Sequence, residues 1–204
     1  MLKQPGLFDP PEPSLLDQPL ALLDLETTGT GPTRDRIIEI GLVLCNRGRQ
    51  EQQWSSLVNP QTPVSDFIAD YTGISNAMLE TAPLFADIAP ELARLLEGRL
   101  LVAHNARFDY GFLQQEFDRC GQRFQAPVLC TVRLSRKLFP KERRHSLDAV
   151  IARHDLNCSA RHRALGDALV LAEFLTHLRR IVNTVDLNRA IETQPGADSS
   201  SSAH

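Results

Sequence analysis

Runs of apolar residues alternate with helical patterns along this chain and predict an α/β domain. The five expected strands are residues 20–26, 37–45, 52–58, 100–103 and 128–131. The first three are joined by short connections, which favours an antiparallel meander. The first strand is a nearly continuous apolar run, which is typical of a central strand covered on both faces.

Helical spacing of apolar residues separates the later strands. The expected helices are residues 75–79, 83–96, 106–120, 146–154 and 163–181, with some helix in the loop at 60–73. Gly98 and Gly121 end two of these helices, and Ser146 is suited to cap a third. Three strands followed by helices that alternate with strands indicate a mixed α/β sheet.

The two ends of the chain differ from its middle. Residues 1–18 are rich in proline and are expected to form a flexible N-terminal segment, whereas residues 183–204 are expected to form a largely disordered C-terminal tail. The folded domain should therefore span residues 19–182. No apolar run is long enough to cross a bilayer, and the start of the chain does not resemble a signal peptide.

Composition narrows the class of protein further. Hydrophobic residues make up 42% of the chain, enough for a sizeable core. The cysteines form no CxxC pair, which favours reduced thiols in the cytoplasm over a zinc site. A net charge of −3 argues against a protein that coats nucleic acid, but an enzyme that grips only a strand end needs few phosphate contacts.

Two acids interrupt the first apolar strand. Asp24 and Glu26 are two residues apart, so their side chains point to the same face. Like charges held this close in a partly buried site repel each other, and a divalent cation would remove that cost. The alternative is a strand end that emerges into solvent, where two acids are harmless.

Two further acids and a histidine lie on or beside predicted helices. Asp167 falls on the apolar stripe of the last helix, and Asp109 lies on the apolar side of the helix at 106–120. His162 precedes the last helix and has a pKa suited to taking a proton from water near neutral pH. The alternatives are an acid placed by the helix dipole, an ordinary surface acid and a solvated loop histidine.

Three short motifs resemble those of the DEDDh (DnaQ-like) 3′→5′ exonucleases, the family that includes the proofreading subunit of bacterial DNA polymerase III. The motifs are Asp24-Leu25-Glu26-Thr27-Thr28-Gly29, His104-Asn105-Ala106-Arg107-Phe108-Asp109 and His162-Arg163-Ala164-Leu165-Gly166-Asp167. The segment His145-Ser146-Leu147-Asp148 also resembles the helix start that usually precedes the third motif. The likeness covers roughly residues 19–180, with the motifs in the family's order.

The resemblance implies an RNase H-like fold, with a five-stranded mixed sheet flanked by helices. It also implies two Mg²⁺ or Mn²⁺ ions, held mainly by Asp24, Glu26 and Asp167, with Asp109 holding the second ion through water. Hard oxygen ligands suit these ions rather than zinc. His162 would be the general base that deprotonates the attacking water. The substrate-binding positions that carry over are Thr27, Thr28, His104, Asn105 and Phe108.

The expected function is the removal of nucleotides from the 3′ end of DNA, releasing nucleoside 5′-monophosphates. An exonuclease that trims RNA 3′ ends is a second interpretation, because the sequence does not settle DNA against RNA, and a catalytically silent nucleic-acid-binding module is a third. The basic segment at 133–144 could steer phosphates or form a solvated charged face. Gln4, Leu7 and Phe8 resemble the short peptide with which bacterial proteins bind the replicative sliding clamp.

Overall fold

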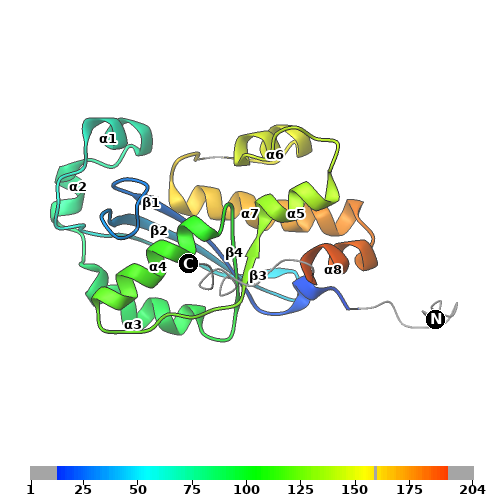
Figure 1. The fold of residues 1–204 in the computed structure, drawn as a ribbon, viewed down its shortest axis with the longest axis horizontal. Coiled ribbons are helices and arrows are strands. Elements are labelled where there is room, and N and C mark those ends of the chain that lie inside the picture. The colour runs from blue at the N-terminus through cyan, green and yellow to red at the C-terminus, as the bar shows by residue number, and fades with distance from the viewer. Residues whose placement is uncertain (1–12, 159, 193–204) are drawn as a thin grey trace, which may run out of the picture.

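The computed structural model describes residues 13–158 and 160–192, which contain a five-stranded mixed sheet (Figure 1). The strands are β1 (Leu20–Thr27), β2 (Ile37–Asn46), β3 (Arg49–Leu57), β4 (Leu100–Ala103) and β5 (Val128–Cys130). Their order across the sheet is β3-β2-β1-β4-β5. The predicted meander is confirmed: β2 is antiparallel to β1 and β3, whereas β4 is parallel to β1 and β5.

Helices cover both faces of the sheet. They are the 3₁₀-helix η1 (Leu15–Asp17) and the α-helices α1 (Asp66–Thr72), α2 (Asn76–Glu80), α3 (Phe85–Leu96), α4 (Arg107–Arg119), α5 (Thr131–Leu138), α6 (Leu147–His154), α7 (Ala164–Ile181) and α8 (Thr184–Glu192). The helices α3 and α4 pack on one face, and α5, α7 and α8 pack on the other (Figure 1). Within the described ranges, none of these helices has the length and apolar character that a membrane crossing requires.

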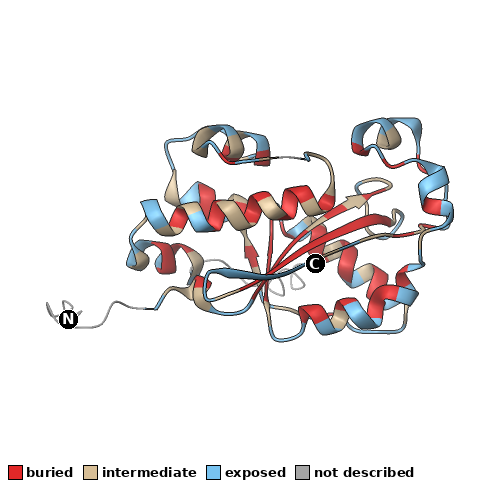
Figure 2. Cartoon of the chain, turned by 180° about the vertical axis from the view of Figure 1, so that it is seen from behind, coloured by how far each residue is buried: buried red, intermediate tan, exposed pale blue. Residues whose placement is uncertain are grey.

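The central strand β1 is buried on both faces because successive side chains of a strand point to opposite sides of a sheet. Leu20 and Leu22 pack against Phe174 in one hydrophobic core, which we call the α7 core. Leu23 and Leu25 pack in a second core, formed with α3 and α4. Figure 2 shows the central strands as mostly buried ribbons. Asp24 and Glu26 therefore lie on a strand that is packed on both faces.

The prediction of a largely disordered tail at 183–204 is wrong for its first part. Residues 184–192 form α8, in which Leu187 and Ala190 are buried in the α7 core. These residues lie three apart and Ile191 follows directly, so the short helix presents a narrow apolar stripe that composition alone conceals. Residues 193–204 lie outside the described part of the chain.

The prediction of a flexible N-terminal segment is also wrong for its last residues. Leu16 of η1 is fully buried in the α7 core, and Asp17 forms an ion pair of 2.7 Å with Arg179 of α7. These contacts attach the segment to the domain just before β1 begins. Residues 1–12 lie outside the described part of the chain, and they include the candidate clamp-binding residues Gln4, Leu7 and Phe8.

The helix after β5 was not expected either. The helix α5 follows β5 directly and takes in the first half of the basic segment at 133–144. Leu134 and Ser135 are buried while Arg133 and Arg136 are exposed, so the helix is amphipathic. Over only eight residues this period does not stand out beside a run of charges, so the sequence pattern does not predict the helix.

Candidate active site

Three carboxylates converge where β1 meets the start of α7. Asp24 and Glu26 lie on β1, and Asp167 lies in the first turn of α7. One carboxylate oxygen from each lies within 4.8 Å of the other two. Asp167 is only 5% exposed, on the face of α7 that packs against the sheet. The structure thus brings Asp167 beside two acids that lie more than 140 positions before it in the sequence.

Close packing of α7 on β2 places Asp167 next to the sheet. Gly41 of β2 lies opposite Asp24 in the β1–β2 ladder. A Cβ atom at Gly41 would lie 2.1 Å from the carbonyl carbon of Ala164 and from the amide nitrogen of Leu165. Only glycine therefore lets the backbone of α7 approach so closely. Because Asp167 follows within the same helical turn, this contact sets the distance between its carboxylate and Asp24.

Asp109 supports the cluster from α4. It lies in the first turn of that helix and is only 3% exposed. Backbone groups of Asp109 itself and of Leu25 hydrogen-bond to its carboxylate, which places it beside the strand between Asp24 and Glu26. The three oxygens within 4.8 Å of one another do not include one from Asp109, so it borders the cluster rather than belonging to it.

Burial raises the pKa of all four carboxylates, and it is the largest cause for each. It raises the pKa of Glu26 to about 7 and that of Asp109 to about 8. The pKa of Asp24 is raised well above its usual value, because the charges of Asp109, Asp167 and Glu26 add to the effect of burial. A divalent cation has the opposite effect, since it stabilises the charged form of each acid.

Asp167 is only partly satisfied by protein groups. Its Oδ2 accepts hydrogen bonds from a guanidinium nitrogen of Arg161 and, at 3.3 Å, from the backbone amide of His162. Its Oδ1 is buried and has no hydrogen-bond partner among the described residues. A buried carboxylate oxygen without a donor is costly, and a hard oxygen ligand of this kind suits Mg²⁺ or Mn²⁺. The donor set therefore fits the divalent ions that the sequence motifs imply.

His162 lies immediately before α7. Its backbone is in the left-handed region, with φ 60°, which costs a non-glycine residue roughly 1–2 kcal/mol. Its ring packs against Tyr71 of α1, with 4.1 Å between the ring centroids, and its backbone amide donates to Asp167. The surrounding contacts therefore hold the histidine at the carboxylate cluster despite its strained backbone.

A buried carboxylate with a partly exposed arginine partner fixes the backbone next to His162. Glu39 of β2 is 4% exposed and accepts hydrogen bonds from Arg163 Nη2 at 2.6 Å and from the backbone amide of Ala164 at 2.9 Å. A carboxylate at the start of a helix is also stabilised by the helix dipole. Glu39 lies opposite Glu26 in the ladder, and its charge contributes to the raised pKa of Glu26.

The turn after β1 is anchored to α4. Thr27 Oγ1 donates to the carbonyl of Gly29 at 2.6 Å, and Thr28 exchanges two hydrogen bonds with the backbone of Arg36. The guanidinium of Arg36 donates to both carboxylate oxygens of Glu116, at 2.7 and 3.0 Å, and the side chain of Glu116 is 1% exposed. The predicted substrate-binding residues Thr27 and Thr28 therefore lie at a turn whose position is fixed by contacts with α4.

Both ring nitrogens of His104 are used within the protein. Nε2 lies 2.9 Å from the carbonyl of His145 and donates to it, because a carbonyl oxygen can only accept. Burial lowers the pKa of His104 to about 4, so the ring is neutral, and its Nδ1 lies 2.9 Å from the hydroxyl of Thr131, which also lies 3.2 Å from the carbonyl oxygen of Ala103. This residue ties the end of β4 to the segment that starts α6, and a nucleotide could contact only its ring face.

Asn105 lies in the turn between β4 and α4, and Phe108 lies in the first turn of α4. Asn105 is exposed and has φ 68°, and its carbonyl accepts from the amide of Phe108 at 2.8 Å. Phe108 packs against Phe112, with 4.9 Å between the ring centroids, and remains partly accessible. Both residues therefore present surface next to Asp109 that a nucleotide can reach.

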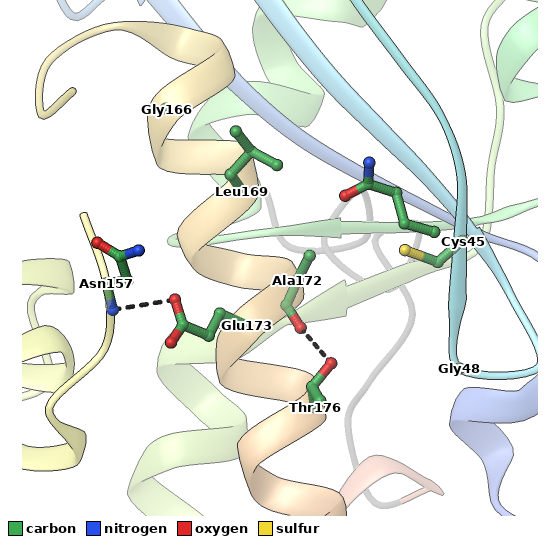
Figure 3. A pocket seen from close by; sticks show the side chains of 9 residues that line it. Cys45, Gly48, Asn157, Gly166, Leu169, Ala172, Glu173 and Thr176 are labelled. Carbon is green, nitrogen blue, oxygen red and sulfur yellow. Dashed lines mark hydrogen bonds between the residues drawn. The ribbon is translucent and has the colours of Figure 1, made fainter. Parts of the chain in front are cut away.

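A cavity of about 380 Å³ lies elsewhere, between α7 and the turn from β2 to β3 (Figure 3). Cys45, Glu173 and Thr176 are among its lining residues, and none of the three converging carboxylates lines it. The carboxylate of Glu173 accepts from the backbone amide of Asn157 at 2.9 Å and so already has a partner. The candidate active site is therefore the carboxylate cluster rather than this cavity.

Comparison with known proteins agrees with the order and setting of the three motifs. The sequence profile of the RNase T exonuclease family matches residues 22–175. The chain belongs to the DEDDh family of 3′→5′ exonucleases.

Curated relatives of this DEDDh domain are much longer proteins. The 3′-5′ exonuclease DinG of Bacillus subtilis is 38% identical over 172 residues, covering 80% of this chain and 18% of that protein. The DNA polymerase III subunit epsilon-like protein of Rhodobacter capsulatus is 38% identical over 177 residues, covering 82% of this chain and 25% of that protein. The PolC-type DNA polymerase III of Caldanaerobacter subterraneus is 32% identical over 190 residues, covering 88% and 14%. The chain thus spans a quarter or less of these relatives.

Solved structures confirm the RNase H-like fold. Exonuclease X in complex with 5′ overhanging duplex DNA superposes with a TM-score of 0.65 and 26% identity, covering 84% of this chain and 99% of that one. The nuclease domain of 3′hExo, a DEDDh family member bound to rAMP, superposes with a TM-score of 0.72, covering 84% and 96%. At 20% identity, this second likeness shows the fold alone.

Sequence reasoning missed several residues that border the DEDDh site. Glu39 carried the same signal as Asp24, an acid inside an apolar strand, and could have been found by it. Arg161 and Tyr71 gave no such signal. Their positions depend on how the segment before α7 and the separate helix α1 fold over the cluster. No local pattern of apolar residues predicts that arrangement.

Proposed function

We propose that this domain removes nucleotides one at a time from free 3′ ends of DNA, single-stranded or frayed, using two Mg²⁺ or Mn²⁺ ions and releasing nucleoside 5′-monophosphates. The observation that carries the proposal is the convergence of Asp24, Glu26 and Asp167 within 4.8 Å, with an oxygen of Asp167 that has no donor in the part of the chain that the structure describes. Four acids whose pKa values are raised by burial have little stabilising role in the fold without a cation.

The roles of the acids follow from their placement. Asp24, Glu26 and Asp167 would hold one ion between them. Asp109, which borders the cluster, would hold the second ion through water. The ions would supply charge stabilisation to the attacking and leaving oxygens of an in-line phosphoryl displacement. The Glu39–Arg163 pair and Gly41 hold the start of α7 against β2, and so keep Asp167 in reach of β1.

His162 would act as the general base. It lies at the cluster, immediately before α7, and an imidazole has a pKa suited to accepting a proton from the attacking water near neutral pH. Its packing against Tyr71 limits the directions in which the ring can turn. Replacing His162 with glutamine should therefore reduce kcat far more than it raises KM for the oligonucleotide.

The turns around the cluster and the first turn of α4 would recognise the strand end. Thr27 and Thr28 stand on the anchored turn after β1, and Asn105 and Phe108 present surface beside Asp109. Stacking on the ring of Phe108 would tolerate any base, as suits a nonspecific trimming enzyme. The exposed cations of the segment at 133–144 would attract the phosphates further from the end.

DNA is the favoured substrate because relatives above 30% identity include DNA polymerase III proteins and DinG. An RNA-trimming exonuclease is the second candidate. A silent binding module is disfavoured because Asp24, Glu26, Asp109, His162 and Asp167 are all present. No disulfide bond joins the cysteines within the described residues, which supports a reducing, cytoplasmic setting.

Matched single-stranded DNA and RNA oligomers of one sequence, each 5′-labelled, test the substrate class. We expect at least a tenfold higher kcat/KM on DNA in Mg²⁺, and a DNA oligomer that ends in a 3′-phosphate serves as the control for end recognition. A faster rate on RNA would replace DNA by RNA in the proposal. Binding of both oligomers without cleavage of either, in Mg²⁺ and in Mn²⁺, would favour the silent module.

The N-terminal residues Gln4, Leu7 and Phe8 would tether the domain to the replicative sliding clamp. The support is the sequence pattern, a glutamine followed by a Leu-Phe pair in a proline-rich segment. We expect the full chain to bind a purified bacterial sliding clamp in a surface plasmon resonance assay, and the Leu7→Ala, Phe8→Ala double variant to lose that binding. Equal binding by both proteins, or none by either, would remove the tether from the proposal.

A further inference from the structure

Arg161 bridges the carboxylate cluster and the surface. One of its guanidinium nitrogens contacts Oδ2 of Asp167, while Nε and Nη2 contact Oδ1 of Asp148 on α6 at 2.8 and 2.7 Å. The two contacts differ in setting, because the side chain of Asp167 is 7% exposed and that of Asp148 is 71% exposed. One end of the bridge is therefore inside the site and the other faces solvent.

The inner contact uses the same carboxylate that the proposed function assigns to a metal ion. A guanidinium on Oδ2 of Asp167 and a divalent cation beside it repel each other, so occupancy of one weakens the other. Arg163, the next cation along the chain, is committed to Glu39 and does not neutralise the cluster in the same way. Arg161 is thus the cation that compensates Asp167 within the protein.

We propose that Arg161 is an internal counter-ion that competes with the divalent metal for Asp167: it holds the metal-free site together and withdraws to Asp148 when the metal binds. This inference rests on the proposed function, because it takes Asp167 to be a metal ligand. Asp148 supplies the place to which the guanidinium withdraws, at the start of α6. His104 fixes that start by its hydrogen bond to the carbonyl of His145.

Removing the guanidinium should have opposite effects on two properties. Without metal, Asp167 and its neighbouring acids lose their compensating charge, so the domain becomes less stable. With metal, no competitor has to be displaced, so the affinity for the ion increases. A residue that merely braces the fold would lower stability without tightening metal binding. A residue that helps to hold the metal site in shape would weaken binding when it is removed.

The test uses the full chain and Arg161→Met, which keeps an unbranched apolar stem without the guanidinium charge. In isothermal titration with Mn²⁺ we expect about a tenfold lower Kd than for the natural protein, the factor that corresponds to one charged hydrogen bond. In EDTA we expect Tm to fall by about 3 °C or more. Arg153→Met, which removes a nearby charge that does not contact Asp167, is the matched control and should leave the Kd for Mn²⁺ within about twofold.

Asp148→Asn tests the other end of the bridge, at an exposed position where folding is not at risk. We expect it to weaken Mn²⁺ binding several-fold in the natural background, because the guanidinium loses its alternative partner, and to have little effect beside Arg161→Met. This variant decides the matter if Arg161→Met fails to fold. Its weaker binding then supports the inference, and unchanged or tighter binding overturns it.

The outcomes separate this inference from the proposed function. Unchanged or weaker Mn²⁺ binding by folded Arg161→Met would overturn the role of Arg161 while leaving the metal site intact. Absence of Mn²⁺ binding by the natural protein would overturn both, because Asp167 would then hold no metal. Tighter binding by Arg161→Met together with a lower Tm in EDTA is the result that supports the inference.

Discussion

The contact between Gly41 and the start of α7 predicts a large effect from one methyl group. In Gly41→Ala, the new Cβ would lie 2.1 Å from two backbone atoms, of Ala164 and Leu165, whereas ordinary van der Waals contact begins at 3.4 Å. Backbone atoms cannot rotate away as a side chain can. The helix must therefore move outward by about 1.3 Å at this point, the difference between those two distances.

Such a movement carries Asp167 away from Asp24, which lies opposite Gly41. Mg²⁺ demands ligand distances close to ~2.1 Å, so a displacement of this size removes Asp167 from an ion held by β1. A misplacement of about 1 Å can cost about 100-fold in rate, and overpacking costs about 1–3 kcal/mol of unfolding free energy. We expect Gly41→Ala to stay folded with kcat at least about 100-fold lower.

Steady-state cleavage of a 5′-labelled oligonucleotide and urea unfolding measure the two effects. Gly111→Ala is the matched control, because its new Cβ would meet only the ring of Pro32, at 3.5 Å, and it should be neutral or slightly stabilising in α4. If Gly41→Ala kept kcat within about threefold of the natural enzyme, the claim that this contact positions Asp167 would be refuted.

Three further predictions concern stability. Glu116→Gln leaves the guanidinium of Arg36 without its buried partner, so urea unfolding should show a loss of about 3 kcal/mol, and a loss under 1 kcal/mol would contradict the role given to this pair. The folded pKa of Glu26 is raised from 4.5 to about 7, so in EDTA the protein should lose stability as pH rises through that window. Thermal unfolding from pH 4 to 8 checks this, and Glu26→Gln should flatten the profile; equal slopes for both proteins would refute it. Ser146→Ala removes the N-cap of α6 and should cost about 1 kcal/mol in the same unfolding assay, whereas no loss would show that the cap is idle.

Much of the fold follows from local patterns in the sequence. The apolar run of β1, the meander and the helices α3, α4 and α7 each have a period long enough to be read directly. The short amphipathic helices α5 and α8 lack that length, and their apolar residues are recognisable only through the α7 core that they cover. Tertiary packing, rather than local propensity, decides whether such segments are ordered.

The candidate site divides in the same way. Asp24, Glu26 and Asp167 can be recognised from the sequence because each puts a charge where the pattern requires an apolar residue. The roles of Arg161 and His104 cannot be recognised in this way, because they depend on partners that belong to other elements. A histidine in the second motif suggested a contact with substrate, and the structure gives both of its ring nitrogens to the protein.

Cleavage of a 5′-labelled single-stranded DNA oligomer, followed on a sequencing gel, tests the central claim most directly. In Mg²⁺ or Mn²⁺ the natural protein should produce a ladder that shortens from the 3′ end. EDTA should abolish the ladder, and Asp167→Asn, which keeps the shape of the side chain without its charge, should slow it by about 1,000-fold or more. Full activity in EDTA or in Asp167→Asn, or shortening from the 5′ end, would contradict a metal-dependent 3′→5′ exonuclease built on these three carboxylates.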